Sequence, residues 1–527
     1  MSTLPRLTRA LATSPALAAR GVVIPPDPAH LALPEKAVQF GTGAFLRGFV
    51  DCYLDEANRD GLFGGRVVAI GSTGSGRDDA LREQDGLYTV ATELDADDRV
   101  VQEYRIVSAV SRALSASQDW DAVLALARAP ELELIFSNTT EVGIQLDPAD
   151  ADAPVAPHVA PRSFPGKLAR VLIERGRTVR WADERGVVVV PCELIPDNGR
   201  TLRALVRTQA ARWGTEPEFF AWLDRAVPFC DTLVDRIVPG TPRGAALERL
   251  RAVLGYDDAL LTSCEPYRLF AIEWPAGAWP SVLRERLAFL DGRHGALITD
   301  DIAPYRERKV RLLNGAHTIL APLGLLLGCE TVRDAVRHPS LGRLVRTAML
   351  DEIAPVVEAD GAEAFGVEVL ARFANPHIRH ALVDVTLQGT MKLRVRVIPA
   401  IVRYVQRTGA VPASLAFGFA GFLHFMRGEL HRARRDAGAP LPADDHAAAL
   451  REPLAAADVD RETLERTLRQ LGRDERLWGT DLTALPGFLE AVTDHLWRIR
   501  TLGVRDAIDH HLASAASARC GSYVNAQ

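Results

Sequence analysis

The chain has 527 residues, 47% of them hydrophobic, with a formal net charge of −6 and a sequence pI near 6.1. This length predicts at least two domains with an ample core, and the mild acidity gives no basic surface for nucleic acid. No apolar run reaches the ~18 residues of a membrane span, and the six scattered cysteines form neither a CxxC pair nor a disulfide framework. We therefore expect a cytoplasmic protein that acts on a small molecule.

Residues 1–34 precede the first pattern typical of a folded domain. Arginines and prolines interrupt the stretch from Leu4 to Ala19, where the core of a secretory leader would be continuous. A weakly amphipathic, arginine-containing transit segment is one interpretation of these residues. We favour the other, an N-terminal arm that is loosely attached to the domain after it.

A glycine turn follows this arm. A short strand is expected over residues 37–40 and a helix over 48–58, with Gly41 and Gly43 between them. Strand, glycine turn and helix follow each other in this order in a dinucleotide site. Gly41 permits a tight turn, Gly43 lets the backbone approach a pyrophosphate, and the start of the following helix offers unpaired N–H groups to the anion.

The rest of the motif leaves the choice of cofactor open. Leu46 stands at the third glycine of GxGxxG, and Arg47 is either a phosphate contact or an ordinary surface arginine. A second strand is expected over 66–70, and the first acid after it is Asp78. An acid near this strand end would hold the ribose diol of NAD, whereas arginine and hydroxyl groups accommodate the 2′-phosphate of NADP.

Strand and helix patterns alternate through the next part of the chain. Strand-like runs cover 132–136 and 186–190, and helical patterns cover 120–128 and 167–175. This alternation favours a parallel sheet covered by helices.

Amphipathic helical patterns dominate after Asp300, and Pro304 interrupts the entry to them. We therefore predict an α/β fold class with two domains. A Rossmann-type dinucleotide-binding domain is expected over residues 35–302, followed by a mostly α-helical substrate and catalytic domain over 303–527.

The start of the helical part concentrates polar groups suited to redox chemistry. In an α-helix at ~100° per residue, Lys309, Asn314 and His317 lie within an arc of about 140°. A lysine with a lowered pKa can take the hydroxyl proton of an alcohol as a hydride departs. Asn314 can donate to the developing oxyanion, and His317 can orient the reacting oxygen. Taken one at a time, these residues are more often a solvated lysine, a packing asparagine and a hydrogen-bonded histidine.

Together, several collinear segments resemble the long-chain mannitol dehydrogenase family. The resemblance extends from residue 36 to residue 510, and an ordered set of this size is far more specific than any one motif. The segments that carry it are Gln39–Arg47, Gln84–Thr89, Ser137–Glu141, Pro191–Gly199, Val234–Ile237, Asp300–Lys309, Lys309–His317 and Arg372–Pro376.

The resemblance implies metal-independent hydride transfer with NAD, NADP not being excluded. It implies that Lys309 is the acid/base and that Asn314 and His317 assist at the oxygen. The cofactor-binding residues that it implies are Phe40, Gly41, Gly43, Phe45, Leu46, Arg47, Ser137 and Asn138.

Within the family, the segments are most similar to the members that interconvert D-tagaturonate and D-altronate. The implied substrate residues are Asn198, Asp235, Arg372 and Lys392. A hexuronate carboxylate favours arginine or lysine as its partner, and Arg372 and Lys392 fall in matching segments. Arg394 and Arg396 are expected to be solvated helix residues.

Several alternatives stay open. Asp235 either positions Lys309 or a substrate hydroxyl, or forms a salt bridge with Arg236, and the reach of Asn198 toward the oxyanion is undecided. The family also contains fructuronate reductases and mannitol-type polyol dehydrogenases. A nucleotide-binding protein without chemistry would require loss of Lys309 or of the glycine turn, and the sequence keeps both.

Overall fold

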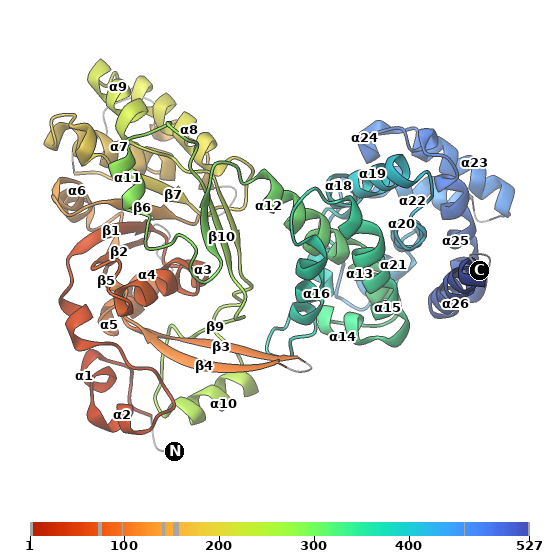
Figure 1. The fold of residues 1–527 in the computed structure, drawn as a ribbon, viewed down its shortest axis with the longest axis horizontal. Helices are drawn as coiled ribbons and strands as arrows, with labels where there is room; N and C mark the ends of the chain where they lie inside the picture. Colours follow the sequence, from red (N-terminus) through yellow and green to blue (C-terminus); the bar gives the residue numbers. More distant parts are fainter. Residues whose placement is uncertain are drawn as a thin grey trace. The chain divides into compact units, whose positions relative to one another are not determined.

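The computed structural model describes residues 4–71, 76–96, 99–139, 143–150, 158–457 and 459–524. The chain divides into two compact units. The first comprises Met1–Leu94 and Val100–Ile302, and the second comprises Asp95–Arg99 and Ala303–Gln527. Strands and helices alternate in the first, and helices build the second (Figure 1). The predicted α/β class with a helical C-terminal part is confirmed.

A five-stranded parallel sheet forms the centre of the first unit, in the order β5-β2-β1-β6-β7. The strand order reverses at β1, which pairs with β2 on one side and β6 on the other. Ligands of open α/β sheets bind outside the carboxyl ends of the strands at such a reversal. The strands are β1 (Glu35–Phe40), β2 (Arg66–Gly71), β5 (Val110–Ser115), β6 (Leu134–Ser137) and β7 (Val188–Pro191).

Successive residues of these strands enter two different cores. Val67 and Ala69 belong to one apolar cluster, whereas Val68 and Ile70 belong to the other. Because side chains alternate between the two faces of a sheet, both faces must be covered by helices. This explains the valine-rich runs of β2 and β7. The principal helices are α4 (Val50–Arg59), α6 (Trp120–Arg128), α7 (Phe164–Thr178), α8 (Asn198–Arg212) and α9 (Pro217–Ala226).

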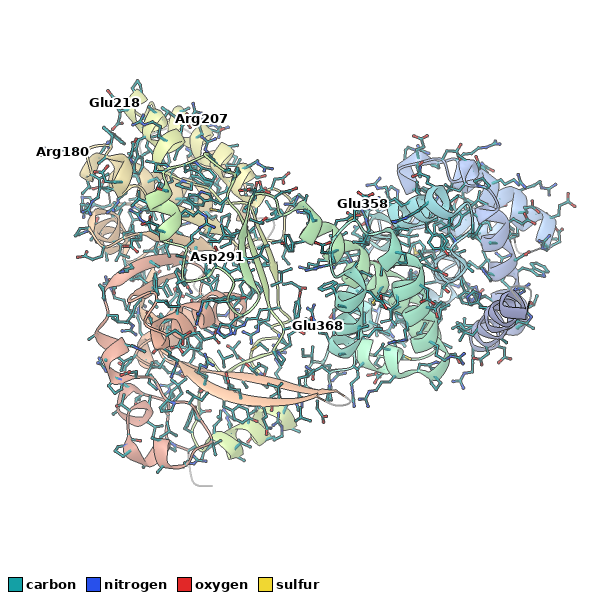
Figure 2. The ribbon with its side chains drawn as sticks, in the orientation of Figure 1. Arg180, Arg207, Glu218, Asp291, Glu358 and Glu368 are labelled. Atoms are coloured by element: carbon teal, nitrogen blue, oxygen red, sulfur yellow. The ribbon has the colours of Figure 1, made fainter. Side chains whose placement is uncertain are left out.

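The outer faces of these helices are polar. Arg207 on α8 and Glu218 on α9 are exposed (Figure 2), whereas Trp222, also on α9, is fully buried. Further helices of the first unit, outside the N-terminal segment, are α3 (Ala44–Arg47), α5 (Arg77–Glu83), η3 (Pro148–Asp150), η4 (Asp183–Arg185), α10 (Ala245–Leu254) and α11 (Ser281–Glu285).

Two small sheets complete the first unit. In one, β10 pairs with β11 in parallel and with β8 antiparallel. In the other, the order is β4-β3-β9. Their strands are β3 (Tyr88–Ala96), β4 (Arg99–Val107), β8 (Thr232–Asp235), β9 (Thr262–Cys264), β10 (Leu269–Glu273) and β11 (Ala296–Thr299).

The N-terminal segment is packed, so the expectation of a loosely attached arm is wrong. Leu7 and Leu17 share a buried cluster with Tyr104 and Leu250. The guanidinium of Arg20 donates to the Leu254 carbonyl at 2.5 Å. The apolar residues that make these contacts are widely spaced and follow no helical period, so the sequence pattern did not reveal them. The segment forms α1 (Arg9–Ala12), α2 (Pro15–Ala19) and η1 (Pro28–Ala32).

The second unit consists of helices. No helix among the described residues is both long and apolar enough to cross a membrane. The elements are α12 (Ala303–Arg308), η5 (Lys309–Asn314), α13 (Gly315–Leu326), α14 (Val332–Arg337), α15 (Pro339–Thr347), η6 (Ala348–Ile353), η7 (Ala354–Val356), α16 (Ala362–Phe373), α17 (Leu382–Val385), α18 (Gly389–Arg396), α19 (Ile398–Thr408), α20 (Ala413–Met426), α21 (Glu429–Asp436), α22 (Ala447–Ala456), α23 (Arg461–Gly472), α24 (Glu475–Trp478), η8 (Leu482–Ala484), α25 (Phe488–Leu502) and α26 (Val504–Val524).

The packing of the N-terminal segment predicts a measurable contribution to stability. Leu7 is fully buried, whereas Leu4 is 40% exposed. We expect Leu7→Ala to lower the free energy of unfolding by about 2–5 kcal/mol, because it leaves a cavity. Leu4→Ala is the matched control and should change it by less than about 0.5 kcal/mol. Equal, small effects in chemical denaturation would show that the segment is loose.

Candidate functional site

The glycine turn lies at the carboxyl end of β1, where the strand order reverses. The Gly41 N–H donates to the Ile70 carbonyl at 2.9 Å, which ties the turn to β2. Gly41 has φ +135°, and a Cβ there would lie 3.1 Å from the Asn138 carbonyl oxygen. Gly43 is the N-cap of α3 with an ordinary φ of −69°, and a Cβ there would meet open space. Gly41 is therefore required by the fold, and Gly43 leaves room above the turn.

A cavity of about 620 Å³ opens over this turn. Its volume is within the range of small-molecule sites. Gly41, Gly43 and Asn138 line it, as the resemblance implies. Arg77, at the end of the segment after the second predicted strand, also lines it, as do Arg162 and Lys167, which the sequence analysis did not single out. Their positive charges suit the phosphates of a dinucleotide, so the residues present fit such a cofactor.

Other implied cofactor residues shape the turn from inside the fold. Phe40 and Leu46 are core residues, and Phe45 stacks on Phe49 with ring centroids 4.9 Å apart. Arg47 is not a surface arginine, since it is only 3% exposed. It donates to the Thr42 carbonyl at 2.6 Å and so holds the turn from below.

A buried carboxylate fixes the segment after β6. Glu193 accepts hydrogen bonds from Ser137 Oγ at 3.1 Å and from the Thr139 N–H at 2.9 Å. Burial raises the pKa of Glu193. The Asn138 amide donates to the Cys192 carbonyl at 2.7 Å. Glu193 lies in the family segment Pro191–Gly199, but the sequence analysis assigned it no role. Thr140 and Glu141 of the segment after β6 lie outside the described residues.

Two implied substrate residues belong to the interior of the first unit. Asn198 is 1% exposed; its amide nitrogen donates to the Glu193 carbonyl at 3.1 Å, and its oxygen accepts from the Thr232 N–H at 2.9 Å. These bonds use its amide group within the fold. Asp235 is buried at the end of β8. Arg236 donates to the carbonyls of Gly48 and Glu265 rather than to Asp235, so the salt-bridge hypothesis is not supported.

In the second unit, Lys309 and Asn314 lie on a π-helical turn rather than on a regular α-helix. The Gly315 N–H donates to the carbonyl of Val310, five residues earlier. Asn314 is five positions after Lys309. On an α-helix this spacing would place the two side chains about 140° apart around the axis, whereas an i→i+5 turn brings them nearly to the same face. The wider turn therefore brings these two residues onto one side. Such turns occur frequently at functional sites.

His317 lies on the following helix, α13, and is 5% exposed. Its ring stacks on Phe373 with centroids 4.1 Å apart and meets the His380 ring edge-on at 5.0 Å. Its Nε2 atom is buried and has no hydrogen-bond partner among the described residues. A buried nitrogen without a partner is unusual and suits a ligand hydroxyl or carbonyl.

Burial and positive charge keep His317 neutral. Burial is the largest cause that lowers its pKa well below the ordinary value, followed by His380 and by the cations Arg372, Arg396 and Lys392. Arg372 is 4% exposed on α16. Lys392 donates to the Val385 carbonyl at 2.9 Å.

Arg396 corrects an expectation. It was expected to be solvated, but burial lowers the pKa of its guanidinium, and no described carboxylate pairs with it. Its carbonyl oxygen accepts from Arg311 at 3.0 Å and lies 3.5 Å from a Cβ built on Gly315. Arg396 and Lys392 are four residues apart on α18, hence on one face. Unlike Arg396, Arg394 uses its guanidinium in an exposed hydrogen bond, which it donates to the Arg476 carbonyl at 2.8 Å.

Residues 35–278 match the mannitol dehydrogenase Rossmann domain, and residues 301–500 match the mannitol dehydrogenase C-terminal domain. The chain belongs to the mannitol dehydrogenase family. It is therefore an oxidoreductase that uses a nicotinamide cofactor. The resemblance found in the sequence is confirmed.

Similar proteins cover nearly the whole chain. It is 37% identical to the altronate oxidoreductase of Bacillus subtilis strain 168, over 92% of this chain and 97% of that protein. It is 39% identical to the altronate oxidoreductase of Klebsiella pneumoniae strain 342, over 90% and 96%.

Solved structures of polyol dehydrogenases share the fold. A substrate-free D-sorbitol dehydrogenase has a TM-score of 0.75 at 22% identity, over 95% of this chain and 100% of that one. The Pseudomonas fluorescens mannitol 2-dehydrogenase, in a ternary complex with NAD and D-mannitol, has a TM-score of 0.68 at 24% identity, over 96% and 99%.

The two glycines predict opposite phenotypes. Gly43→Ala should leave the free energy of unfolding within about 1 kcal/mol but weaken NADH binding about tenfold or more, because its methyl group enters the cavity. Gly41→Ala should cost about 1–3 kcal/mol of stability, because its φ suits only glycine. Thermal unfolding and NADH fluorescence titration measure both effects. Unchanged NADH affinity in Gly43→Ala would show that the cofactor does not bind at this turn.

Proposed function

We propose that this family member interconverts D-tagaturonate and D-altronate with NAD. The observation that carries the proposal is the cluster of cations around neutral His317 in the second unit. A neutral polyol requires no such charge, whereas a hexuronate carboxylate does. The altronate oxidoreductases that resemble this chain support the same substrate.

The cavity over the glycine turn would hold the dinucleotide. Gly41 and Gly43 let the backbone approach its pyrophosphate, with Arg162 and Lys167 as the nearby cations. The bound nicotinamide supplies or accepts the hydride. We favour NAD because the Asp78 carboxylate lies against Gly71, the last residue of β2, and accepts from Thr42 at 3.2 Å. An acid at this strand end suits the ribose diol of NAD. Residues 72–75 of the same segment lie outside the described residues.

Proton transfer is assigned to the second unit. Lys309 would give its proton to the keto oxygen during reduction and take it back during oxidation. Asn314, brought to the same side by the π turn, would donate an amide hydrogen bond to the oxygen as negative charge develops. His317 remains neutral, so its unpartnered Nε2 can orient a hydroxyl without adding charge. Arg372, Lys392 and Arg396 would hold the carboxylate.

The direct test follows oxidation of NADH and NADPH at 340 nm, a wavelength standard for these cofactors, with purified protein and one ketose substrate at a time. We expect turnover with D-tagaturonate and NADH. Preference for D-fructuronate would indicate the alternative uronate reductase, and preference for D-fructose a polyol dehydrogenase. Cofactor binding without turnover of any of them would contradict an enzymatic role.

Removal of the acid/base should separate chemistry from binding. We expect Lys309→Ala to lower kcat by about 10²–10⁴-fold, because proton transfer is lost. Binding of NADH should stay within about twofold of wild type, because the phosphate-binding residues are unchanged. Nearly wild-type turnover in this variant would exclude Lys309 as the acid/base.

Two arginines of α18 provide a matched pair for substrate selection. Arg396→Met should lower kcat/KM for D-tagaturonate by about 10–100-fold, the value of a charge-assisted hydrogen bond, while kcat/KM for neutral D-tagatose stays nearly constant. Arg394→Met should change both by less than about twofold, because its partner is a surface carbonyl. Equal losses for both substrates in Arg396→Met would make Arg396 a structural residue.

A further inference from the structure

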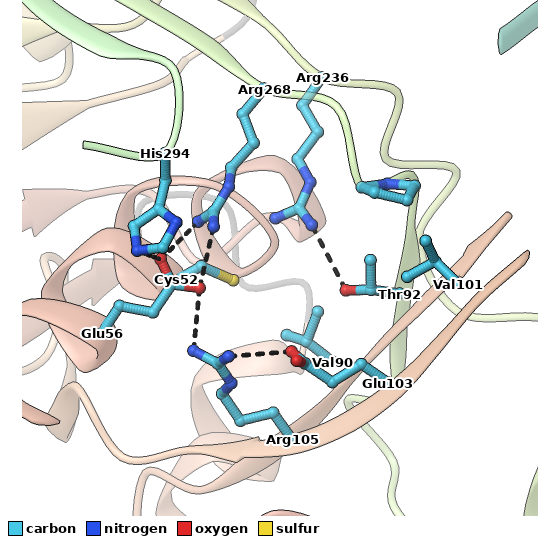
Figure 3. A pocket seen from close by; sticks show the side chains of 11 residues that line it. Cys52, Glu56, Val90, Thr92, Val101, Glu103, Arg105, Arg236, Arg268 and His294 are labelled. Atoms are coloured by element: carbon cyan, nitrogen blue, oxygen red, sulfur yellow. Dashed lines mark hydrogen bonds and ion pairs between the residues drawn. The ribbon is translucent and has the colours of Figure 1, made fainter. Parts of the chain in front are cut away.

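A second, smaller cavity lies in the first unit and plays no part in the proposed reaction. It measures about 200 Å³ and is lined by α4, the β3–β4 hairpin and the segments around Arg236, Arg268 and His294. Figure 3 shows the guanidinium groups of Arg105, Arg236 and Arg268 converging on it from different elements. Arginines from distant parts of the chain thus line one cavity.

The cavity carries more positive than negative charge. Glu56 accepts from both Arg105 and Arg268 at 2.9 Å. The other arm of Arg105 reaches Glu103 at 2.9 Å. The lining therefore contains two carboxylates and three guanidinium groups, which leaves one positive charge without a counter-charge. His294, with Nε2 3.7 Å from Glu56, adds a second when it is protonated.

Arg236 holds the uncompensated charge. It is 8% exposed, and its partners are the carbonyls of Gly48 and Glu265 and the hydroxyl of Thr92 at 3.4 Å. Among the described residues no carboxylate forms an ion pair with it. A buried charge is costly without a counter-ion.

Two arginines of the lining have donors that are poorly used. The Nε atom of Arg105 is buried and has no acceptor among the described residues. The bond from Arg236 to Thr92 is long for a guanidinium donor, and Thr92 also lines the cavity. A negatively charged acceptor in the cavity would give Arg236 a stronger partner than Thr92.

We propose that this cavity binds a small oxyanion of the size and charge of inorganic phosphate. Guanidinium forks match the paired oxygens of such anions. At about 30 Å³ per water, 200 Å³ holds roughly six waters, enough for a hydrated oxyanion but not for a dinucleotide. The half-exposed Glu103 and His294 give the anion a path from solvent.

Arg236 connects the site to the helix after the glycine turn. Arg236 donates to the carbonyl of Gly48, which is the C-cap of α3, the helix that begins after Gly43. An anion that neutralises Arg236 would therefore act on the support of the cofactor-binding turn. The binding site is independent of the substrate assignment, so it can fail or hold without affecting the proposed function.

The experiment measures binding of sodium phosphate to the full chain by calorimetry, with ionic strength held constant by sodium chloride. We expect saturable binding that Arg105→Met weakens about tenfold or more. Glu103→Gln should strengthen it several-fold, because it removes a competing negative charge from the lining. Glu216→Gln is the matched control, since Glu216 pairs with a surface arginine, Arg177, elsewhere in the first unit, and it should leave the affinity unchanged.

If phosphate binds only at the glycine turn, Lys167→Met should abolish its binding and Glu103→Gln should leave its affinity unchanged. That outcome would overturn the proposal, as would an absence of saturable binding or an equal response of all variants, which is a general salt effect. Because Glu103→Gln retains every arginine of the cavity, the test holds even if Arg105→Met fails to fold.

Discussion

The arrangement of the second unit depends on one buried arginine, Arg311, at the centre of the π turn. It is 9% exposed, and its Nε donates to Glu307 at 2.8 Å. Its other arm donates to the carbonyls of Val395 and Arg396, the last residues of α18. The Arg311 guanidinium thus holds α18, which carries two of the candidate carboxylate-binding cations, against the turn that carries Lys309. The guanidinium bonds to backbone carbonyls, so it sets the position of α18 without using the side chains of that helix.

Charge then gives this arrangement its chemical character. Lys392 and Arg396 lie on one face of α18, and Arg372 lies on α16 beside Phe373, on which His317 stacks. Burial, supported by His380 and the cations, lowers the pKa of the imidazole and keeps it neutral, and an anionic substrate would reduce the repulsion among the cations. The same set of contacts therefore accounts for a histidine that orients without charge and for a preference for a carboxylate over a polyol.

The sequence predicts the elements whose signals are local. Short apolar runs located β1, β2, β6 and β7, because strands buried on both faces are mostly apolar, whereas β5 carries Ser111 and Arg112 and was not predicted. Gly41 was identifiable because its turn tolerates no side chain. It could not predict what tertiary contacts decide. A 3.6-residue period cannot show the π turn at Lys309, and a cation in a basic helix such as Arg396 looks solvated until its neighbours are known. Asn198 stands in a family motif, yet its amide is used to join β7 to β8.

The central claim is that a neutral His317 lies among cations that favour a substrate carboxylate. An NMR titration of histidine-labelled protein, with His317 assigned by substitution, tests it directly. The account predicts an imidazole that stays neutral well below pH 6.5 in the free protein, and a pKa that rises when D-altronate binds but not when the neutral alditol D-altritol is added. Ordinary titration of His317 in the free protein, or the same response to both ligands, would contradict it.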